Sequence, residues 1–358
     1  MEKQKVIISE QLEQVLSTEI AACKADRIFI LTDETTHRLC LPVVKDHKCI
    51  EGAQEITIPA GDTNKTLESV THVWGELQRM GATRHSLLIN LGGGMVTDLG
   101  AFAASTFKRG ISIINIPTTL LSMVDASVGG KTGFNFGGLK NEIGVFNNAD
   151  CVILDTVFLK TMDEENILSG YAEMLKHGLI STEEHWAELM SFDIEKPDLK
   201  ELGTMVAKSV QVKERIVMED PTEKGIRKAL NLGHTVGHAF ESLALNPPSP
   251  NTNHLSPVLH GYAVAWGLVC ELYLSVAKTG FPVEKMRQMT RFIFEHYGRM
   301  SIACDDYPTL LELMTHDKKN TGRDINFTLL GGIGDIRINQ TATKEEIEEA
   351  LDFYREGC

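Results

Sequence analysis

A carboxylate, a lysine and three histidines in the second half of the sequence have residue types and spacings suited to a catalytic metal site. Glu173 and Lys176 lie in SGYAEMLKHGLI, His234 and His238 in LNLGHTVGHAFES, and His260 in LHGYAVAWG. Side chains four residues apart share one face of an α-helix, so His234 and His238 can point into one site. Two imidazoles with a carboxylate suit zinc or another divalent ion. A lone histidine on an apolar face is more often a core residue, but this pair lies among small residues that leave room for a ligand.

Two further histidines fit the metal hypothesis less well. His177 lies four residues after Glu173, and His254 lies in LNPPSPNTNHLSPV, residues 245–258. Four prolines and three asparagines in that segment exclude a helix or an inner strand and predict a surface loop. We therefore rank His254 and His177 below the other candidates.

A glycine turn in the first half lies between a predicted strand and a predicted helix. The β-rich run 86–91 leads into Gly92, Gly93 and Gly94, and a helical pattern containing Asp98 follows. Such a turn lets the backbone approach a pyrophosphate, which the free N–H groups of the helix N-terminus can bind. Three consecutive glycines are a weaker signal than GxGxxG, so the motif alone favours a tight turn and a nucleotide site about equally.

A second glycine-rich segment is accompanied by cations. The segment 118–135 reads TTLLSMVDASVGGKTGFN and includes Lys131, but it lacks the glycine spacing of a P-loop, which disfavours a standard kinase. Arg109, Lys140 and Asn141 lie nearby in the sequence and supply donors suited to phosphate or carboxylate. Solvated surface charges are the alternative interpretation for any one of these lysines.

The elements that must position these residues change character along the chain. β-rich runs at 27–32, 86–91, 111–116 and 151–154 alternate with helical patterns such as 67–80, which predicts a parallel sheet with crossover helices. After residue 163, apolar residues recur three and four apart, as in 165–180 and 199–217, which predicts helices. We therefore predict an α/β domain, residues 1–158, followed by a mostly α-helical domain, residues 159–358.

Composition narrows the range of partners. The chain has 358 residues, enough for two cores, and its 35 basic and 49 acidic residues give a formal charge of -14. This sign argues against nucleic acid as a partner, so an anionic small molecule would need a local cluster of Lys and Arg.

The sequence shows no membrane or export signal. The longest apolar run, 261–277, contains Glu271 and is too short for a comfortable membrane span, so a buried helix explains it better. The first residues, MEKQKVIISEQLEQVL, carry charges where a secretory signal needs an apolar core. The seven cysteines form no CxxC pair, which argues against a disulfide framework. We predict a cytoplasmic protein without membrane contact.

Several phrases of the sequence resemble one known enzyme family closely. MVDASVGGKTGFN, LKNEIGVF, GYAEMLKHGLI and LNLGHTVGHAFE occur in the order and wording of the 3-dehydroquinate synthases, members of the sugar phosphate cyclase superfamily. The resemblance runs from about Asp33 to Lys319 and covers most of the chain. It implies a homodimer whose N-terminal domain is Rossmann-like and binds NAD, with a metal and substrate site in the cleft beside the helical domain.

The resemblance also implies roles for individual residues. The implied ligands of one divalent ion, zinc or cobalt, are Glu173, His234 and His260, so that His238 takes an acid–base role together with Glu223 and Lys176. The implied cofactor residues are Asp33, Asp62, Lys65, Gly93, Gly94, Asp98, Thr118, Thr119, Asp125, Lys140 and Thr161. The implied substrate residues are Arg109, Lys131, Asn141, Lys213, Arg227, Asn231 and one of Lys318 and Lys319. Three features depart from the family pattern: Asp62 stands where Glu is usual, Tyr262 follows His260-Gly261 where Glu is common, and the Pro-rich segment lengthens the chain before His260.

The implied reaction converts 3-deoxy-D-arabino-heptulosonate 7-phosphate into 3-dehydroquinate. It proceeds by transient oxidation with NAD, elimination of phosphate, reduction and an intramolecular aldol closure, and it classes the protein as a carbon–oxygen lyase of the shikimate pathway. Two other activities remain as alternatives: a related cyclase acting on sedoheptulose 7-phosphate, and a metal-dependent alcohol dehydrogenase of related fold. A non-catalytic binding module is disfavoured, because buried charges without a task are costly.

Overall fold

The chain forms two compact units in the computed structural model, which describes residues 4–137, 139–245, 258–315 and 325–357. The first unit comprises residues 1–163 and 198–214, and the second comprises 164–197 and 215–358. The sequence predicted two consecutive domains, 1–158 and 159–358, whereas the structure groups the first part of helix α8 (Leu199–Glu219) with the first unit. Gly203 permits this packing, since a Cβ there would lie 2.9 Å from Thr156 Cγ2. The domain boundary near residue 158 itself stays a prediction.

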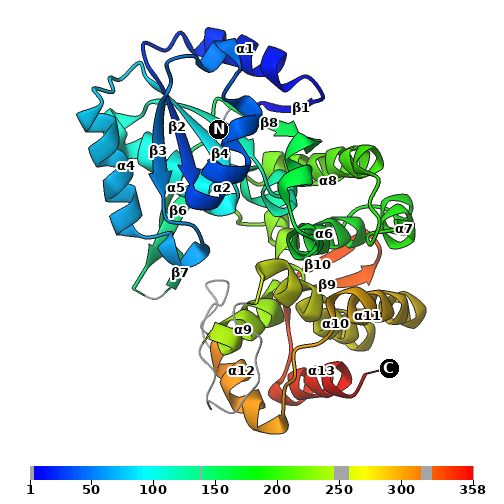
Figure 1. Cartoon of the computed structure of the whole chain (residues 1–358). Helices are drawn as coiled ribbons and strands as arrows, with labels where there is room; N and C mark the ends of the chain where they lie inside the picture. Colours follow the sequence, from blue (N-terminus) through cyan, green and yellow to red (C-terminus); the bar gives the residue numbers. More distant parts are fainter. Residues whose placement is uncertain (1–3, 138, 246–257, 316–324, 358) are drawn as a thin grey trace. The chain divides into compact units, whose positions relative to one another are not determined.

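The first unit is built on a six-stranded parallel sheet with the strand order β1-β8-β5-β4-β2-β3 (Figure 1). Its strands are β1 (Val6–Ser9), β2 (Ile28–Asp33), β3 (Gln54–Ile58), β4 (Leu87–Gly92), β5 (Ser112–Pro117) and β8 (Cys151–Asp155). Its other helical elements are α1 (Leu12–Cys23), α2 (Glu34–Leu39), α3 (Leu41–Val44), η1 (Lys48–Ile50), η2 (Asp62–Asn64), α4 (Leu67–Arg79), α5 (Gly94–Thr106), η3 (Phe107–Arg109), η4 (Ser122–Ala126) and η5 (Thr156–Thr161). The predicted α/β fold with a parallel sheet is confirmed.

The centre of the sheet explains why its strands read as apolar runs rather than alternating ones. Every residue of β4 is buried, as expected for a parallel strand that is covered on both faces. Helix α5 lies close to the sheet because Gly100 has no Cβ, which would otherwise meet Asn90 Oδ1 at 2.0 Å. The NH2 group of Asn90 donates to Asn115 Oδ1 at 2.8 Å, which links the two buried side chains of neighbouring strands.

The glycine-rich segment after η4 forms an antiparallel hairpin that the sequence interpretation missed. Its strands are β6 (Lys131–Phe136) and β7 (Leu139–Phe146). The two backbones approach closely, because a Cβ on Gly133 would lie 2.3 Å from the carbonyl oxygen of Ile143. Gly133 here serves strand packing. The glycine spacing argued against a P-loop but did not predict a hairpin. All of β7 is exposed.

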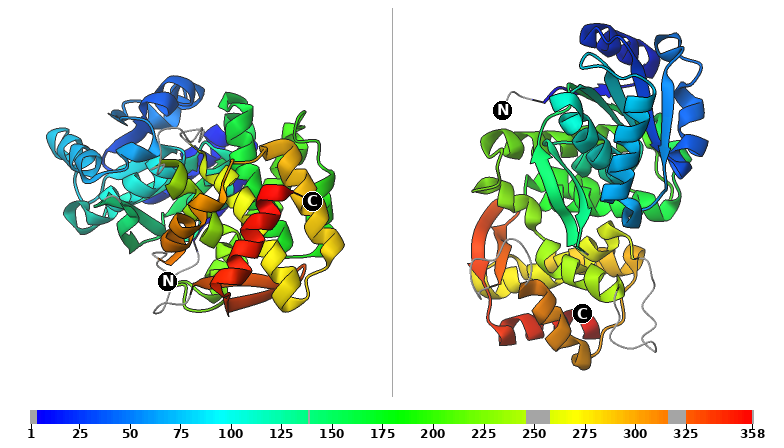
Figure 2. Two further views of the ribbon diagram at one scale, coloured as in Figure 1. Left: turned by 90° about the horizontal axis from the view of Figure 1, so that it is seen from below. Right: turned by 90° about the vertical axis from the view of Figure 1, so that its left-hand side faces the viewer.

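The second unit is mostly helical, as predicted, with one small hairpin. Its helical elements are α6 (Glu164–Leu179), α7 (Glu183–Ser191), the remainder of α8, η6 (Ile226–Asn231), α9 (His234–Leu245), α10 (His260–Thr279), α11 (Val283–Tyr297), η7 (Cys304–Asp306), α12 (Tyr307–Thr315) and α13 (Lys344–Glu356). The hairpin of β9 (Asn326–Gly332) and β10 (Asp335–Thr341), orange to red in Figure 2, was not predicted. Strand β9 packs on α10, where Thr279 Oγ1 donates to the Leu330 carbonyl at 2.5 Å.

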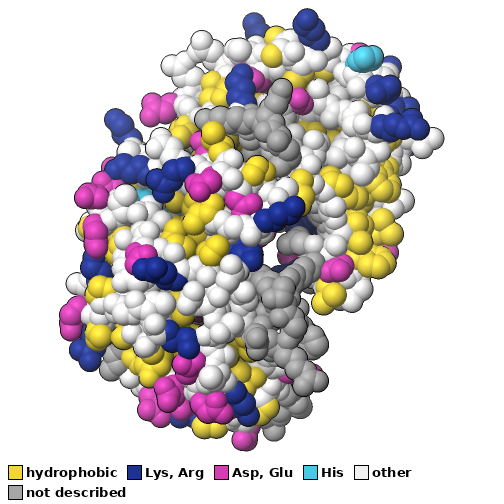
Figure 3. All heavy atoms as spheres, turned by 180° about the vertical axis from the view of Figure 1, so that it is seen from behind, with side chains coloured by type: hydrophobic (Ala, Val, Ile, Leu, Met, Phe, Trp, Pro, Cys, Tyr) yellow, Lys and Arg dark blue, Asp and Glu magenta, His cyan; other side chains and the backbone are white. Residues whose placement is uncertain are grey.

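The described helices and one face of the surface can be compared with the predicted absence of membrane contact and with the predicted charge. Among the described helices, none is long and apolar enough to cross a membrane. On the face drawn in Figure 3, basic and acidic side chains are interspersed.

Candidate metal and nucleotide sites

Glu173, His234 and His260 bring ligand atoms together within the second unit. Glu173 Oε1 lies 3.4 Å from His234 Nε2 and 3.5 Å from His260 Nε2, and one ligand atom of each residue lies within 4.8 Å of the other two. With ligand bonds of about 2.0–2.1 Å, neighbouring ligands of a tetrahedral zinc ion are about 3.3–3.4 Å apart. The cluster therefore fits one divalent ion, and its members are the residues that the family resemblance nominated.

Helix ends supply both imidazoles. His234 is the first residue of α9 and His260 the first residue of α10, while Glu173 lies fully buried inside α6. The His238 ring lies beside them, with its centroid 5.3 Å from that of His234 and 5.9 Å from that of His260. Helical spacing alone paired His234 with His238, whereas in the structure the second imidazole beside Glu173 comes from a different helix.

The far side of each imidazole ring also has a partner. His234 Nδ1 is 3.1 Å from the Leu232 carbonyl oxygen, and His260 Nδ1 is 3.5 Å from Glu241 Oε2. Both acceptors favour hydrogen on Nδ1, so Nε2 is the nitrogen of each ring that faces Glu173 and that can bind an ion when it is deprotonated. Sequence reasoning missed Glu241, although it lies seven residues after His234 and hence on a similar face of the same helix.

Buried charges around Glu173 set the protonation of the cluster. Burial opposes ionisation of Glu173, but the Lys176 ammonium and His234 hold its pKa well below its ordinary value. Lys176 itself is buried and donates to Glu173 Oε2. Burial lowers the pKa of His234 to about 4. Burial also opposes protonation of His260, but the carboxylates of Glu173 and Glu241 outweigh it and raise the pKa of His260 to about 10.

Glycines allow the helices of the metal cluster to approach one another. A Cβ on Gly261 would lie 1.8 Å from the carbonyl oxygen of Ser169 in α6, and the Gly261 N–H donates to Ser169 Oγ at 3.1 Å. A Cβ on Gly267 would lie 2.0 Å from the carbonyl oxygen of Gly233. Gly233 has a φ of 80°, a backbone conformation that favours glycine. Packing thus explains why glycine follows His260, because only glycine lets α10 begin against α6.

Element η6 of the second unit carries two of the predicted substrate residues. The Arg227 guanidinium is buried, and its Nη1 donates to the Pro221 carbonyl at 2.7 Å. The Asn231 amide donates to Glu223 Oε1 at 2.9 Å, which joins a predicted substrate contact to a predicted proton-transfer group. Glu223 has a φ of 60°, a conformation that costs free energy in a non-glycine residue and is often found at functional sites.

In the first unit, five predicted cofactor residues lie where three neighbouring parallel strands end. Asp33 ends β2, Gly93 and Gly94 follow β4, and Thr118 and Thr119 follow β5. Ligands of doubly wound sheets bind at this carboxyl edge. The arrangement is the one expected for a dinucleotide site.

The start of helix α5 is open to an anion. Gly93 is the N-cap of α5 and makes no side-chain capping bond. A Cβ on Gly93 would lie 3.2 Å from Thr119 Cγ2, and one on Gly94 would lie 3.0 Å from the Cβ of Ala126, so larger residues would crowd the turn. Uncapped N–H groups at a helix N-terminus suit a pyrophosphate. Asp33, by contrast, caps α2 by accepting from the Thr36 N–H at 2.7 Å.

A partly buried set of hydrogen bonds joins predicted cofactor and substrate residues. Lys65 Nζ donates to Asp98 Oδ2 at 2.6 Å and to Asn141 Oδ1 at 2.5 Å. Burial raises the pKa of Asp98, against the influence of the nearby Lys65 and Lys213 ammonium groups. Lys213 in α8 donates to Asp125 Oδ1 at 2.6 Å. These contacts bring together residues that lie far apart in the sequence.

The tip of the β6–β7 hairpin is tied to the loop that carries Asp62. Lys140 Nζ lies 3.2 Å from Asp62 Oδ2, and the Asn135 amide donates to the Asp62 carbonyl at 3.0 Å. Asn141 has a φ of 50° and Arg109 a φ of 69°, so both adopt the left-handed conformation. The shorter Asp at position 62, which departs from the family pattern, still reaches Lys140.

The remaining predicted residues lie elsewhere in the first unit or fall outside the described residues. Thr161 Oγ1 donates to the Phe158 carbonyl at 2.7 Å, and Lys131 is exposed at the start of β6. Lys318, Lys319 and His254 lie outside the described residues, as does most of the Pro-rich segment 245–258.

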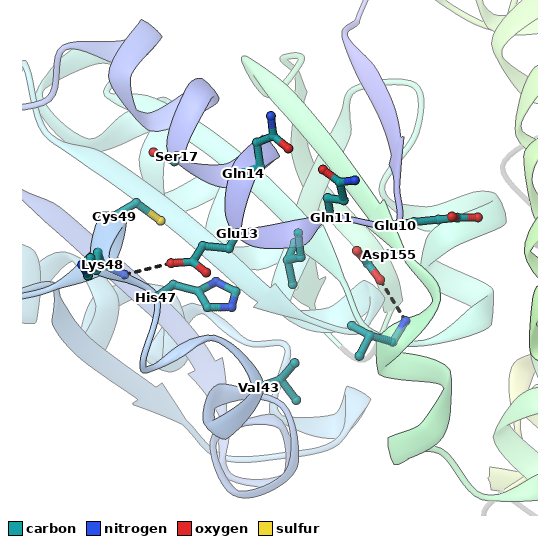
Figure 4. A pocket seen from close by; sticks show the side chains of 12 residues that line it. Glu10, Gln11, Glu13, Gln14, Ser17, Val43, His47, Lys48, Cys49 and Asp155 are labelled. Carbon is teal, nitrogen blue, oxygen red and sulfur yellow. Dashed lines mark hydrogen bonds between the residues drawn. The ribbon is translucent and has the colours of Figure 1, made fainter.

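An open pocket of about 780 Å³ lies elsewhere in the first unit (Figure 4). Residues of α1 and the turn before it, including Glu10, Glu13 and Gln14, line this pocket together with His47 and the 3-10 turn η1, and Glu13 points toward His47 and Lys48. Asp155 also lines this pocket, and its carboxylate accepts a hydrogen bond from the Val157 N–H at 3.0 Å. None of the predicted site residues lines it.

Fold and site together define a class: proteins with a parallel α/β unit and a helical unit that carries a buried Glu-His-His cluster. Family models described as "3-dehydroquinate synthase N-terminal" and "3-dehydroquinate synthase C-terminal" match residues 55–169 and 170–320. The 3-dehydroquinate synthase of Parabacteroides distasonis is 55% identical over 357 residues, which cover 100% of this chain and 99% of that protein. The corresponding Bacillus pumilus protein is 36% identical, with 85% of this chain and 82% of that protein covered. The chain belongs to the 3-dehydroquinate synthase family.

Solved structures of more distant proteins share the fold. A 2-epi-5-epi-valiolone synthase from Streptomyces hygroscopicus, with NAD+ and Zn2+ bound, has a TM-score of 0.85 at 24% identity, covering 99% of this chain and 97% of that one. A 2-deoxy-scyllo-inosose synthase complexed with carbaglucose-6-phosphate, NAD+ and Co2+ has a TM-score of 0.83 at 21% identity, covering 99% and 96%. At these identities the likeness concerns the fold alone.

Proposed function

We propose that the chain converts 3-deoxy-D-arabino-heptulosonate 7-phosphate into 3-dehydroquinate and phosphate. Family membership over nearly the whole chain supports this activity. The observation that carries the proposal is the convergence of Glu173, His234 and His260, since an enzyme of this chemistry needs a metal beside its substrate. The reaction makes the protein a carbon–oxygen lyase of the shikimate pathway.

The cofactors are NAD and one divalent ion, zinc or cobalt. The metal is held by the Glu-His-His cluster, and the pyrophosphate of NAD by the uncapped start of α5 after Gly93. Relatives of the same fold contain NAD+ with Zn2+ or Co2+. When bound, NAD supplies a hydride acceptor that is regenerated within each cycle, and the ion supplies a Lewis acid for the C4 and C5 hydroxyls.

His238 moves the proton of the C5 hydroxyl in this proposal. Its ring lies beside both histidines of the cluster, close enough to the metal site to accept and return the proton of a bound hydroxyl. Lys176 keeps Glu173 ionised and hence able to bind a cation. Glu223, hydrogen-bonded to Asn231, is the second candidate for proton transfer.

Binding of the two anionic groups of the substrate is assigned to the cations and amides identified above. Phosphate is assigned to Arg109, Asn141 and one of Lys318 and Lys319; carboxylate is assigned to Lys131, Lys213 and Arg227. Arg227 already has a buried guanidinium that is fixed by the Pro221 carbonyl, which prepares it for a planar carboxylate. The substrate is a multiply charged anion held by a local group of cations in a protein of net charge -14, so its capture should depend steeply on ionic strength.

The homodimer is also part of the proposal. The exposed hairpin β6–β7 presents large apolar side chains at Phe136, Leu139, Ile143 and Phe146, which favour burial against another protein surface. A second copy of the chain is the proposed occupant. Sedimentation analysis tests this directly, and a monomer at micromolar concentration would contradict it.

A turnover assay tests the function. Phosphate release from the heptulosonate phosphate should require both NAD and the divalent ion, stop after chelation and return when zinc or cobalt is restored. Absorbance at the NADH band should not rise during turnover, because reduced cofactor is consumed in each cycle. Steady NADH accumulation would point to a dehydrogenase, and release of phosphate from sedoheptulose 7-phosphate alone would overturn the choice of substrate.

A further inference from the structure

Two buried carboxylates connect the helices that carry the imidazoles of the metal cluster. Glu271 lies in α10 and Glu241 in α9, and both are almost completely shielded from solvent. Each one reaches the opposite helix near its first turn, where the histidine of that helix lies. Each carboxylate therefore supports the start of the other helix, where the histidine of that helix lies.

Glu271 holds the backbone around His234. Its Oε2 accepts from the Gly233 N–H at 2.7 Å, and its Oε1 accepts from the Thr235 and Val236 N–H groups at 2.9 and 3.2 Å. The first N–H groups of a helix have no partners inside that helix, so Glu271 caps the start of α9 from 35 to 38 residues away in the sequence. A carboxylate at this position also interacts favourably with the positive end of the helix dipole.

Glu241 holds the ring of His260. Its Oε2 lies 3.5 Å from His260 Nδ1, the nitrogen that faces away from Glu173. A carboxylate in this position fixes the orientation of a ligating imidazole and raises its basicity. His260 is the more exposed of the two imidazoles, with 29% of its side chain accessible against 10% for His234, so packing alone holds it less firmly.

We propose that Glu241 and Glu271 are positioning residues of the metal site, each holding from the opposite helix one of the two histidines that bind the ion. Neither is a ligand. This inference rests on the proposed metal site, and it adds that the affinity of the site depends on two side chains beyond the three that contact the ion.

The test measures zinc affinity of the metal-free protein by competition with a chromophoric chelator. Glu241→Ala and Glu271→Ala should each weaken zinc binding about 10–100-fold, as loss of such outer partners does in other metal sites. Glu241→Gln should recover part of the affinity, because its amide oxygen can still accept from Nδ1–H. Thr290→Ala is the matched control: it removes the hydroxyl of a fully buried residue that bonds within α11, and zinc affinity should not change.

Circular dichroism establishes that each variant is folded before its affinity is compared. If Glu271→Ala does not fold, Glu271→Gln replaces it, since the amide keeps one acceptor for three N–H donors and should still weaken binding. Affinities of the Glu241 and Glu271 variants within twofold of the unmodified protein would overturn the inference. Absence of zinc binding by the unmodified protein would instead overturn the proposed metal site.

Discussion

Gly261 and Ser169 lie in direct backbone contact, and this contact determines where His260 stands. The Gly261 N–H donates to Ser169 Oγ, and a Cβ at position 261 would lie 1.8 Å from the Ser169 carbonyl oxygen. Helix α10 therefore begins immediately beside α6, the helix that carries Glu173. A side chain at position 261 would force the two metal ligands apart.

Gly261→Ala should consequently destabilise the protein and weaken metal binding together. Overpacking of this kind costs about 1–3 kcal/mol, and more where backbone atoms must move. Gly75→Ala in α4 is the control, because nothing lies within 4 Å of the added Cβ, and alanine should stabilise that helix by about 0.5–1 kcal/mol. Denaturant unfolding of both variants checks this, and equal stability of the two would contradict the packing argument.

Glu173→Gln should abolish metal binding and also destabilise the fold. The substitution removes the partner of the buried Lys176, and an unpaired buried charge costs about 3–5 kcal/mol. Adding Lys176→Met should recover much of the stability without restoring metal binding. Unfolding curves and zinc titrations on the single and double variants separate the two roles; recovery of zinc binding in the double variant would exclude Glu173 as a ligand.

Binding of a divalent ion near neutral pH should release about one proton per ion. His260 has a pKa raised to about 10, so without metal it carries a proton at pH 7 that it must lose to become a ligand. His234, with its pKa lowered to about 4, is already neutral and releases none. Affinity should therefore rise about tenfold per pH unit between pH 6 and 9. Calorimetry in buffers of different ionisation enthalpy measures the release, and a value of zero at pH 7 would be inconsistent with this assignment.

Asn141 offers a way to separate backbone strain from side-chain function. Its φ of 50° favours glycine over alanine, so Asn141→Ala should be less stable than Asn141→Gly by about 1 kcal/mol. Both variants lose the acceptor for Lys65 and the proposed phosphate contact, so both should raise KM for the substrate by a similar factor. A KM effect confined to the alanine variant would show that strain, not the amide, matters for binding.

Much of the fold could be predicted because it depends on local patterns. The buried runs that became β2, β4, β5 and β8 and the apolar periodicity of α6 and α8 were readable from the chain. The hairpins β6–β7 and β9–β10 were not, because their stability comes from pairing and packing rather than from a distinct local signal. Gly133 lies in a glycine-rich segment for which the sequence predicted no hairpin, and it serves the close approach of two strands.

The candidate site was also predictable from the sequence only in part. The sequence by itself determined which residue types were present, and its phrases nominated Glu173, His234 and His260. Helical spacing favoured His238 as the partner of His234, since spacing describes only one helix at a time. Only the tertiary structure decided that His260 and Glu271 of α10 meet this helix, and that Glu241 of this helix meets His260. Contacts between helices depend on packing at glycines such as Gly261, which no local pattern specifies.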